Sequence, residues 1–353
     1  MENQNQTPHK RRVRYKGKYP KKFEEKYKEL QPEKYKDTIE HVIQKGNTPA
    51  GMHISIMVKE ILDFLNIQPG ETGFDATLGY GGHTKAMLQC LNGKGHIYAT
   101  DVDPEESAKT KKRLAEQGFG EELLTVKLQN FCTIDEIAKE VGGFDFILAD
   151  LGVSSMQIDN PKRGFSFKTD GPLDLRLNQE TGISAAQRLD TISREELAGM
   201  LCENSDEPYC EELAKAITDE IRRGNHIDTT TKLRQVIEKT LDFLPEKEKK
   251  ETIKKTCQRT FQALRIDVNH EFEVLYEFME KLPDALRPGG RVAILTFHSG
   301  EDKLVKKALK AGYKAGIYSD YAKDVIRPSA QECAKNGRAR STKMRGAAIR
   351  IRS

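Results

Sequence analysis

The stretch that decides the fold reads GFDATLGYGGH and occupies residues 73–83. Its first six residues predict a short strand, and the glycine turn GYGG follows directly at 79–82. From His83 to Leu91 apolar residues recur at helical spacing, so the turn opens a helix. Glycines let a ligand approach the backbone, and a helix begins with N–H groups that have no partner within the helix. The segment therefore predicts a cradle for a nucleotide-like ligand, although glycine is also common in plain tight turns.

Strands and helices alternate on both sides of this turn. Four further strands are predicted from their apolar runs, at residues 96–100, 123–128, 144–149 and 291–297. Helical periodicity predicts helices at 54–65, 104–117 and 271–286, and the turn RPGG at 287–290 precedes the last strand. Strands that alternate with helices form a parallel sheet covered on both faces. The predicted fold class is therefore a doubly wound α/β fold.

The alternation stops between about residues 160 and 265. This region contains a loop rich in Gly and Pro and then helical patterns with little strand signal. We therefore predict a helical domain inserted between the fourth and fifth strands. The predicted parts are a basic, disordered extension at 1–45, the first part of the core at 46–158, an inserted helical substrate-recognition domain at 159–265, and the second part of the core with a basic C-terminal end at 266–353.

Charge is segregated along the chain. The 58 Lys and Arg residues and the 54 Asp and Glu residues give a formal charge of +4. Residues 10–22 carry eight basic residues and residues 334–353 carry seven, and neither stretch contains an acidic residue. Outside them, 43 basic residues face 54 acidic ones, a net charge of −11. An acidic body with basic ends predicts that the ends attract a polyanion such as RNA, with a solubilising tail as the alternative for residues 1–45.

Composition argues against several classes of protein. No apolar run approaches the roughly 20 residues that span a bilayer, and the polar N-terminus MENQNQTPHKRR lacks the apolar core of a secretory signal. The six cysteines are scattered without a CxxC pair, which argues against a zinc ribbon or a disulfide framework and for a reducing cytoplasm. No group of His, Cys and carboxylate residues has metal-ligand spacing, so we expect no metal site.

Asp101 ends the second predicted strand, about 20 residues after the glycine turn. A carboxylate at this position can accept hydrogen bonds from both hydroxyls of a ribose. Its alternative role is to cap the helix at 104–117, for which Asp103 is the better candidate. A dinucleotide fits the turn poorly, because Thr84 stands where the GxGxxG pattern requires glycine. S-adenosylmethionine fits better, since it needs a glycine turn, an acid for the ribose and an apolar slot for adenine, which Phe131 can line.

Eight segments of the chain resemble the bacterial RsmH (MraW) family, in the same order and over residues 53–345. They are DATLGYGGHT (75–84), DVDP (101–104), DLGVSSMQID (150–159), RGFSFKTDGPLDLRL (163–177), SAAQRL (184–189), RTFQALRIDVNHEFEVL (259–275), RVAILTFHSGED (291–302) and NGRARSTKMR (336–345). One such segment could arise by chance, but eight in the right order are specific. Two features depart from the family, namely Gly300 where the family usually has Leu, and a longer basic extension before residue 45.

The resemblance implies a class I, Rossmann-like methyltransferase core with an inserted helical domain. It also implies an S-adenosylmethionine-dependent enzyme that methylates N4 of a cytidine in the decoding region of small-subunit (16S) ribosomal RNA. Carried over by motif, the expected cofactor contacts are Gly81, Gly82, His83, Asp101, Phe131, Asp150 and Gln157.

The expected catalytic group is Asp150, His298 and Ser299, which follow the fourth and fifth predicted strands. The cytosine amine is a weak nucleophile because its lone pair is delocalised, so an enzyme must hold it in line and accept a hydrogen bond from it. Asp150 is the leading acceptor. The alternative is that Asp150 only bonds to the cofactor or caps a turn. His298 can contact the target base or its phosphate, or merely bond to neighbouring backbone.

Cations and aromatic residues on the predicted insertion and near the C-terminus predict contacts with RNA. Aromatic side chains stack on flipped or single-stranded bases, and arginines contact phosphates. The candidates are Arg163, Phe165, Phe167, Arg259, Arg338 and Arg340. The two phenylalanines can equally pin their loop to the core.

The leading hypothesis is a cytoplasmic rRNA methyltransferase. Its expected partner is small-subunit rRNA within an assembled or nearly assembled small subunit, with no membrane partner and with a homodimer left open. One alternative is an amino-methyltransferase that acts on another RNA or DNA base, such as adenine at N6. The other is a non-catalytic ribosome-assembly factor, which the complete set of cofactor motifs disfavours.

Overall fold

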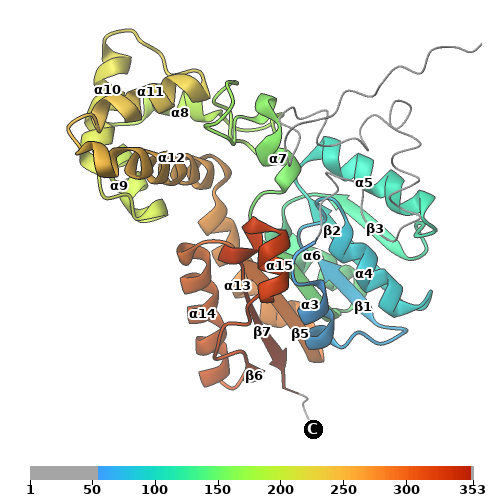
Figure 1. Cartoon of the computed structure of the whole chain (residues 1–353). Coiled ribbons are helices and arrows are strands. Elements are labelled where there is room, and N and C mark those ends of the chain that lie inside the picture. The colour runs from blue at the N-terminus through green and yellow to red at the C-terminus, as the bar shows by residue number, and fades with distance from the viewer. Residues whose placement is uncertain (1–54, 351–353) are drawn as a thin grey trace, which may run out of the picture. The chain divides into compact units, whose positions relative to one another are not determined.

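The computed structural model describes residues 55–350, which Figure 1 shows as a coloured ribbon. The chain divides into two units, Met1–Met52 and His53–Ser353, and the described residues all lie in the second. The predicted basic, disordered extension at 1–45 lies outside the described residues. Within residues 55–350, no helix is both long enough and apolar enough to cross a membrane.

The described residues form one sheet of seven strands in the order β3-β2-β1-β4-β5-β7-β6. The strands are β1 (Thr72–Asp75), β2 (His96–Asp101), β3 (Leu124–Leu128), β4 (Phe144–Asp150), β5 (Leu286–Thr296), β6 (Tyr318–Tyr321) and β7 (Lys343–Ile349). The strands β1 to β5 pair in parallel, and β7 is antiparallel to both β5 and β6. The predicted doubly wound fold is confirmed, and this strand order is that of a class I methyltransferase.

Two strand boundaries differ from the sequence prediction. The first strand ends at Asp75 rather than at residue 78, because the Asp75 carboxylate accepts a hydrogen bond from the backbone N–H of Thr77 and turns the chain. The predicted turn at 287–290 is a bulge inside β5 rather than a separate loop. Phe144 of β4 pairs with Leu286 and Phe146 pairs with Arg291, so the intervening residues of β5 bulge out.

Helices cover both faces of the sheet. On one face lie α3 (Val58–Leu65), α4 (Gly82–Leu91) and α5 (Pro104–Glu116), and on the other lie α6 (Ile134–Val141), α13 (Glu271–Ala285) and α14 (Ser299–Lys314). In β4, Phe146 and Leu148 pack against the first layer, whereas Ile147 and Ala149 pack against the second. This double burial explains why the strand is apolar almost throughout.

Five helices between β4 and β5 enclose a hydrophobic cluster of their own. They are α8 (Ala185–Thr191), α9 (Arg194–Ser205), α10 (Cys210–Arg222), α11 (Thr230–Thr240) and α12 (Glu246–Asn269). The segments α7 (Ser155–Asp159) and η3 (Pro161–Arg163) lead into them from β4, and α12 runs into α13 at His270. The domain boundaries 159–265 stay a prediction, and α12 continues four residues past the second of them.

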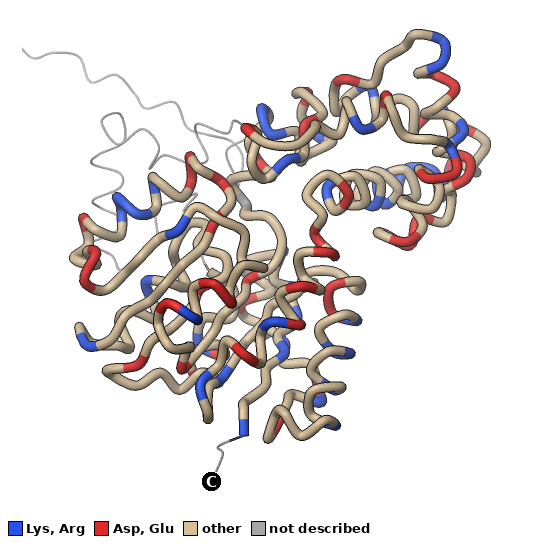
Figure 2. Tube along the Cα trace, turned by 180° about the vertical axis from the view of Figure 1, so that it is seen from behind, with Lys and Arg blue, Asp and Glu red and all other residues tan. Residues whose placement is uncertain are grey.

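The remaining short elements are η2 (Phe131–Thr133), α15 (Ala330–Lys335) and η4 (Gly337–Ser341). Acidic and basic residues are interspersed along the described chain, as the red and blue segments of Figure 2 show. Neither the core nor the five-helix region is uniformly basic, so an RNA site must depend on local groups rather than on net charge.

Candidate active site

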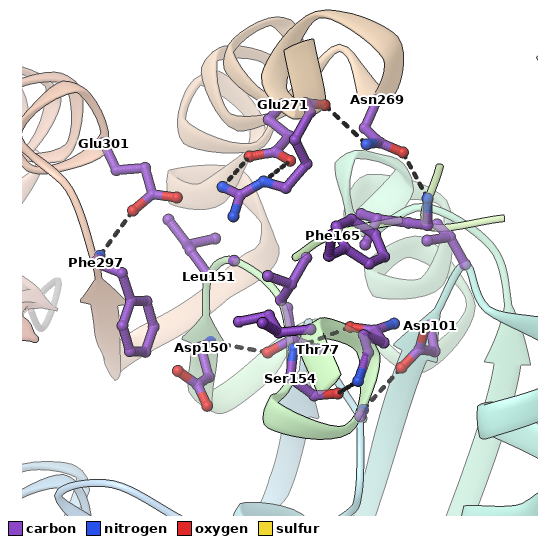
Figure 3. A pocket seen from close by; sticks show the side chains of 18 of the residues that line it. Thr77, Asp101, Asp150, Leu151, Ser154, Phe165, Asn269, Glu271, Phe297 and Glu301 are labelled. Carbon is purple, nitrogen blue, oxygen red and sulfur yellow. Dashed lines mark hydrogen bonds and ion pairs between the residues drawn. The ribbon is translucent and has the colours of Figure 1, made fainter. Parts of the chain in front are cut away.

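A cavity of about 610 Å³ lies at the carboxyl ends of the central parallel strands. One wall comes from the core and includes the glycine turn, Asp101 and Asp150. The opposite wall comes from the loop around Phe165 and from α12 and α13 (Figure 3). Parallel α/β sheets bind ligands outside the carboxyl ends of their strands, where the strand order reverses. The cavity has this position and is the candidate active site.

The glycine turn opens α4, as the sequence predicts. Gly81 has a φ of 75°, in the left-handed region, and a Cβ there would lie 2.7 Å from Cγ2 of Thr110. A Cβ on Gly82 would lie 2.0 Å from Oγ of Ser55. These glycines therefore serve the packing of the protein itself as well as access to the backbone.

Asp101 lies beside this turn with both carboxylate oxygens oriented by backbone. Its Oδ2 accepts a hydrogen bond from Gly79 N at 2.8 Å, and its Oδ1 accepts one from Asp103 N at 2.9 Å. Burial raises the pKa of Asp101 to about 6. Each oxygen keeps a further lone pair, so the carboxylate can accept hydrogen bonds from ribose hydroxyls.

Asp103 caps α5, as the sequence predicts. Its Oδ1 accepts hydrogen bonds from the backbone N–H groups of Glu105 and Glu106. Its Oδ2 accepts hydrogen bonds from Arg163 Nη1 at 2.7 Å and from Gln157 Nε2 at 3.2 Å. The cap thus ties the cofactor loop to the segment that leads into the five helices.

Arg163 is buried, and its hydrogen bonds run to the protein itself. Its second terminal nitrogen donates to the backbone carbonyls of Arg176 and Leu177. The paired Asp103 side chain is only 2% exposed. Arg163 does not line the cavity, so the geometry gives it the role of holding this loop in place and offers no support for a phosphate contact.

Asp150 ends β4 on the cavity wall. Its backbone N–H donates to Oγ1 of Thr77 at 2.8 Å (Figure 3). Its Oδ2 lies 3.3 Å from Nδ1 of His83, while its Oδ1 is buried without a hydrogen-bond partner. A buried oxygen left without a donor is costly, so this atom is placed to accept a hydrogen bond from a bound ligand.

His83 and Asp75 lie behind Asp150. The His83 ring is buried, and its Nε2 is 2.9 Å from the carbonyl oxygen of Ile56. Burial alone would lower the pKa of His83, but the contact with Asp150 outweighs it and the pKa is raised. Asp75 is fully buried and accepts hydrogen bonds from Thr77 N and Thr84 Oγ1, and burial raises its pKa.

His298 caps α14 and also lines the cavity. Glu301 and His298 form a reciprocal cap, in which Glu301 N donates to His298 Nδ1 at 3.5 Å and His298 N donates to Glu301 Oε2 at 3.4 Å. Glu301 Oε2 also accepts from Phe297 N at 2.8 Å. Burial would raise the pKa of Glu301, but its contacts with His298 and the Phe297 N–H and the charge of Arg265 outweigh burial and lower it. Ser299 is exposed, does not line the cavity, and lies 3.5 Å from Asp206 Oδ2. The predicted catalytic set is therefore brought together only in part.

Gly300 departs from the family pattern for a visible reason. A Cβ on Gly300 would lie 2.6 Å from Cζ of Phe272, whose ring packs edge-on against the His298 ring with centroids 5.7 Å apart. In this chain Phe272 fills the space that a larger residue at position 300 would need.

One group of His, Cys and carboxylate residues within the described chain could hold a metal ion by distance alone. Its members are Glu271, His298 and Glu301. Both oxygens of Glu271 already accept hydrogen bonds from Arg265, at 2.7 and 2.8 Å. A guanidinium in this cluster supplies the positive charge that a metal would otherwise bring.

The residues predicted to contact RNA fall into two groups. Phe165, Phe167 and Arg338 line the cavity. Phe165 is buried in the five-helix cluster and Phe167 packs edge-on against Phe261, as expected if they pin the loop. Arg338 Nη2 lies 3.3 Å from Asp159, and its Nη1 is buried without a hydrogen-bond partner. Arg259 and Arg340 do not line the cavity.

A polar stripe on α12 was not predicted from the sequence. The side chains that this helix adds to the cavity wall include Gln258, Gln262, Arg265 and Asn269. They recur at intervals of three to four residues and so share one helix face. This spacing, over residues 258–269, is the signal that could have identified them.

All seven predicted cofactor residues line the cavity. Phe131 also packs edge-on against Phe278, with ring centroids 5.2 Å apart. A glycine turn, a carboxylate with free lone pairs and an aromatic wall fit the three parts of S-adenosylmethionine. The Gln157 side chain is less available to a cofactor, because its amide oxygen already accepts a hydrogen bond from Ser154 N within a capping box.

Residues 50–350 match the family model described as the MraW methylase family. Proteins called "Ribosomal RNA small subunit methyltransferase H 1" are 87% identical over 96% of this chain in Agathobacter rectalis and 71% identical over 98% of it in Lachnoclostridium phytofermentans. These matches cover 97% and 94% of the relatives' own lengths. A "Ribosomal RNA small subunit methyltransferase H" from Acidobacterium capsulatum is 37% identical over 84% of this chain and 97% of its own. The chain therefore belongs to the MraW methylase family, and S-adenosylmethionine is its methyl donor.

Proposed function

We propose that this methylase transfers a methyl group to the exocyclic N4 of a cytidine in the decoding region of small-subunit (16S) rRNA. The observation that carries the proposal is the buried, unpartnered Oδ1 of Asp150 on the cavity wall. An amine N–H is a donor that can satisfy such an oxygen. The names of the relatives support small-subunit rRNA as the substrate.

The chemistry needs a positioned amine more than it needs a strong base. S-adenosylmethionine supplies a methyl group on a sulfonium, which leaves as a neutral thioether. Asp150 Oδ1 holds one N–H of the target amine, which orients the nitrogen lone pair and favours its pyramidal form. After transfer, the N–H bond electrons stay on nitrogen and the proton passes to Asp150. Positioning and charge stabilisation of this kind contribute several kcal/mol.

The core wall accounts for the proposed cofactor site. Asp101 binds the ribose hydroxyls, Phe131 contacts the adenine, and the turn with Gly81 and Gly82 approaches the amino-acid end. Asp101 suits this role because two backbone N–H groups already fix its orientation.

The opposite wall suits a base that has left its helix. Phe167 presents an aromatic ring, and Gln258 and Gln262 present amides. Beside this wall, Arg338 of η4, which packs on the core, has a guanidinium nitrogen without a hydrogen-bond partner. Aromatic stacking and amide hydrogen bonds read an extruded base, and arginine contacts the adjoining phosphate. We propose that the substrate is rRNA within an assembled or nearly assembled small subunit, which places the enzyme in the cytoplasm.

The test is to incubate the protein with labelled S-adenosylmethionine and small subunits that lack the modification. Digestion and mass spectrometry then identify the labelled nucleoside, and naked rRNA in a parallel reaction tests the need for an assembled subunit. We expect N4-methylcytidine at one position. Label on adenosine would show a different amino-methyltransferase, and binding without label would show an assembly factor; either result contradicts the proposal.

A further inference from the structure

The contacts of His83 require a proton between its ring and Asp150. The Ile56 carbonyl can only accept a hydrogen bond, so the His83 nitrogen that contacts it, Nε2, carries a proton. In a neutral ring, Nδ1 is then an acceptor, and it faces the Asp150 carboxylate oxygen at 3.3 Å. Two acceptors at this distance repel, so one further proton is held between them.

We propose that this proton resides on His83, and that the resulting imidazolium holds the Asp150 carboxylate turned so that Oδ1 faces the target amine. His83 is then a positioning residue that acts through Asp150. The inference rests on the proposed function for its substrate, but the protonation of the pair is a property of the protein alone.

The charges around the ring favour this position of the proton. Two carboxylates, Asp150 and Asp75, face His83, and both raise its pKa. Asp75 is 1% exposed and is held by Thr77 N and Thr84 Oγ1. The first turn of α4 acts in the other direction, because the positive end of a helix dipole disfavours a cation. The close contact with Asp150 outweighs that one partial charge.

The pair suits the proton balance of the reaction. When the N4 lone pair forms the new N–C bond, the C–S bond electrons leave with sulfur and the amine becomes cationic. That cation is a strong acid because the ring withdraws the lone pair, so a weakly basic carboxylate is sufficient to take its proton. The carboxylate must also be held in one orientation before the reaction, and the adjacent imidazolium does this.

The first test reads the proton directly in the full-length protein without substrate. Nitrogen-15 NMR of the histidine rings shows whether each nitrogen carries a proton, and a His83→Asn variant assigns the signal. We expect His83 to be doubly protonated at pH 7.5. In Asp150→Asn, the amide N–H₂ can donate to a neutral Nδ1, so the ring should keep its place and lose the charge. A neutral His83 at pH 7.5 in the unmodified protein would overturn the inference, whatever its activity.

The second test uses two variants that each keep one of the two contacts. His83→Asn retains a donor near the position of Nδ1, so it keeps the contact with Asp150 and loses the hydrogen bond to Ile56. His83→Gln retains a donor near the position of Nε2, so it keeps the hydrogen bond to Ile56 and loses the contact with Asp150. We expect the single-turnover rate to fall about 100-fold in His83→Gln and about tenfold in His83→Asn.

The pH profile separates positioning from packing. In the unmodified protein the rate should fall at high pH as His83 loses its proton, and in His83→Asn this fall should disappear because an amide does not titrate. Equal losses in the two variants with unchanged profiles would show a purely structural histidine. If no subunit substrate is methylated at all, the proposed function fails, and the NMR test still decides the protonation of His83.

Discussion

The two walls of the cavity differ in the polar groups that they present to a ligand. On the core wall, Asp101 is fixed by two backbone N–H groups, and Asp150 is held on one side by His83 and left open on the other. On the opposite wall, Arg265 and Asn269 are already bonded to Glu271 and to backbone, and the exposed Gln258 is the group that can still adapt. Groups fixed before binding suit chemistry, which needs preorganisation, whereas adaptable groups suit recognition of a large substrate. The comparison predicts that the core wall controls rate and cofactor affinity and the other wall controls affinity for RNA.

The largest expected effect comes from Asp150→Asn. The variant keeps the shape of the side chain but removes the charged acceptor, so the single-turnover rate should fall by about 10²- to 10⁴-fold. Affinity for the small subunit should change little, because the residue belongs to the core wall. Rapid-quench kinetics and filter binding measure the two quantities, and melting temperature checks the fold. A near-normal single-turnover rate would remove Asp150 from the chemistry.

Arg163→Ala should lower stability rather than RNA affinity. It would leave the Asp103 carboxylate buried without its cation, and breaking a buried pair in this way costs about 3–5 kcal/mol. Urea denaturation measures the loss, and Arg340→Ala, at an exposed position, is the control that should not change stability. If Arg163→Ala unfolds normally but binds subunits weakly, then the original prediction of a phosphate contact is right and the structural role is wrong.

The sequence predicted the core wall better than the opposite wall, and the reason is physical. Asp101 and Asp150 are polar residues that end apolar strands, and the carboxyl ends of parallel strands meet at one edge. Gln258 belongs instead to a helix whose partners are set by tertiary packing, so its sequence neighbours do not reveal which face meets the cavity. The proton between His83 and Asp150 depends on the Ile56 carbonyl, a contact across 27 positions that no local pattern encodes.

Contacts between residues far apart in sequence also limited the prediction of the fold. The strands β6 and β7 were not predicted individually, because β7 reads KMRGAAI and carries Arg345 in a strand that is buried at its centre. The charge is tolerated because Arg345 Nε donates to Asp302 of α14 at 2.7 Å. A strand that contains a buried cation is difficult to predict from sequence, because the cation's partner lies elsewhere in the chain.

Asp101→Asn should weaken cofactor binding by about 1.5–3 kcal/mol, because charge-assisted hydrogen bonds to the ribose are lost. In the unmodified protein, affinity should also fall as the pH drops through about 6, where the carboxylate takes up a proton. Calorimetry with S-adenosylmethionine between pH 5 and 8 measures both effects. The variant should show no such pH dependence. Unchanged affinity in Asp101→Asn would contradict the ribose role and move the ligand contact elsewhere on the core wall.

The smallest expected effect tests the opposite wall. Gln258 is exposed on α12 and lines the cavity, so Gln258→Ala should remove one hydrogen bond to the substrate and weaken subunit binding by about 0.5–1.5 kcal/mol. Cofactor affinity and melting temperature should not change. Gln235→Ala is the matched control, because Gln235 is also an exposed helical glutamine but lies on α11, outside the cavity. If Gln258→Ala instead slowed single turnover at saturating subunit, then this wall would take part in the chemistry, and the division between the two walls would fail.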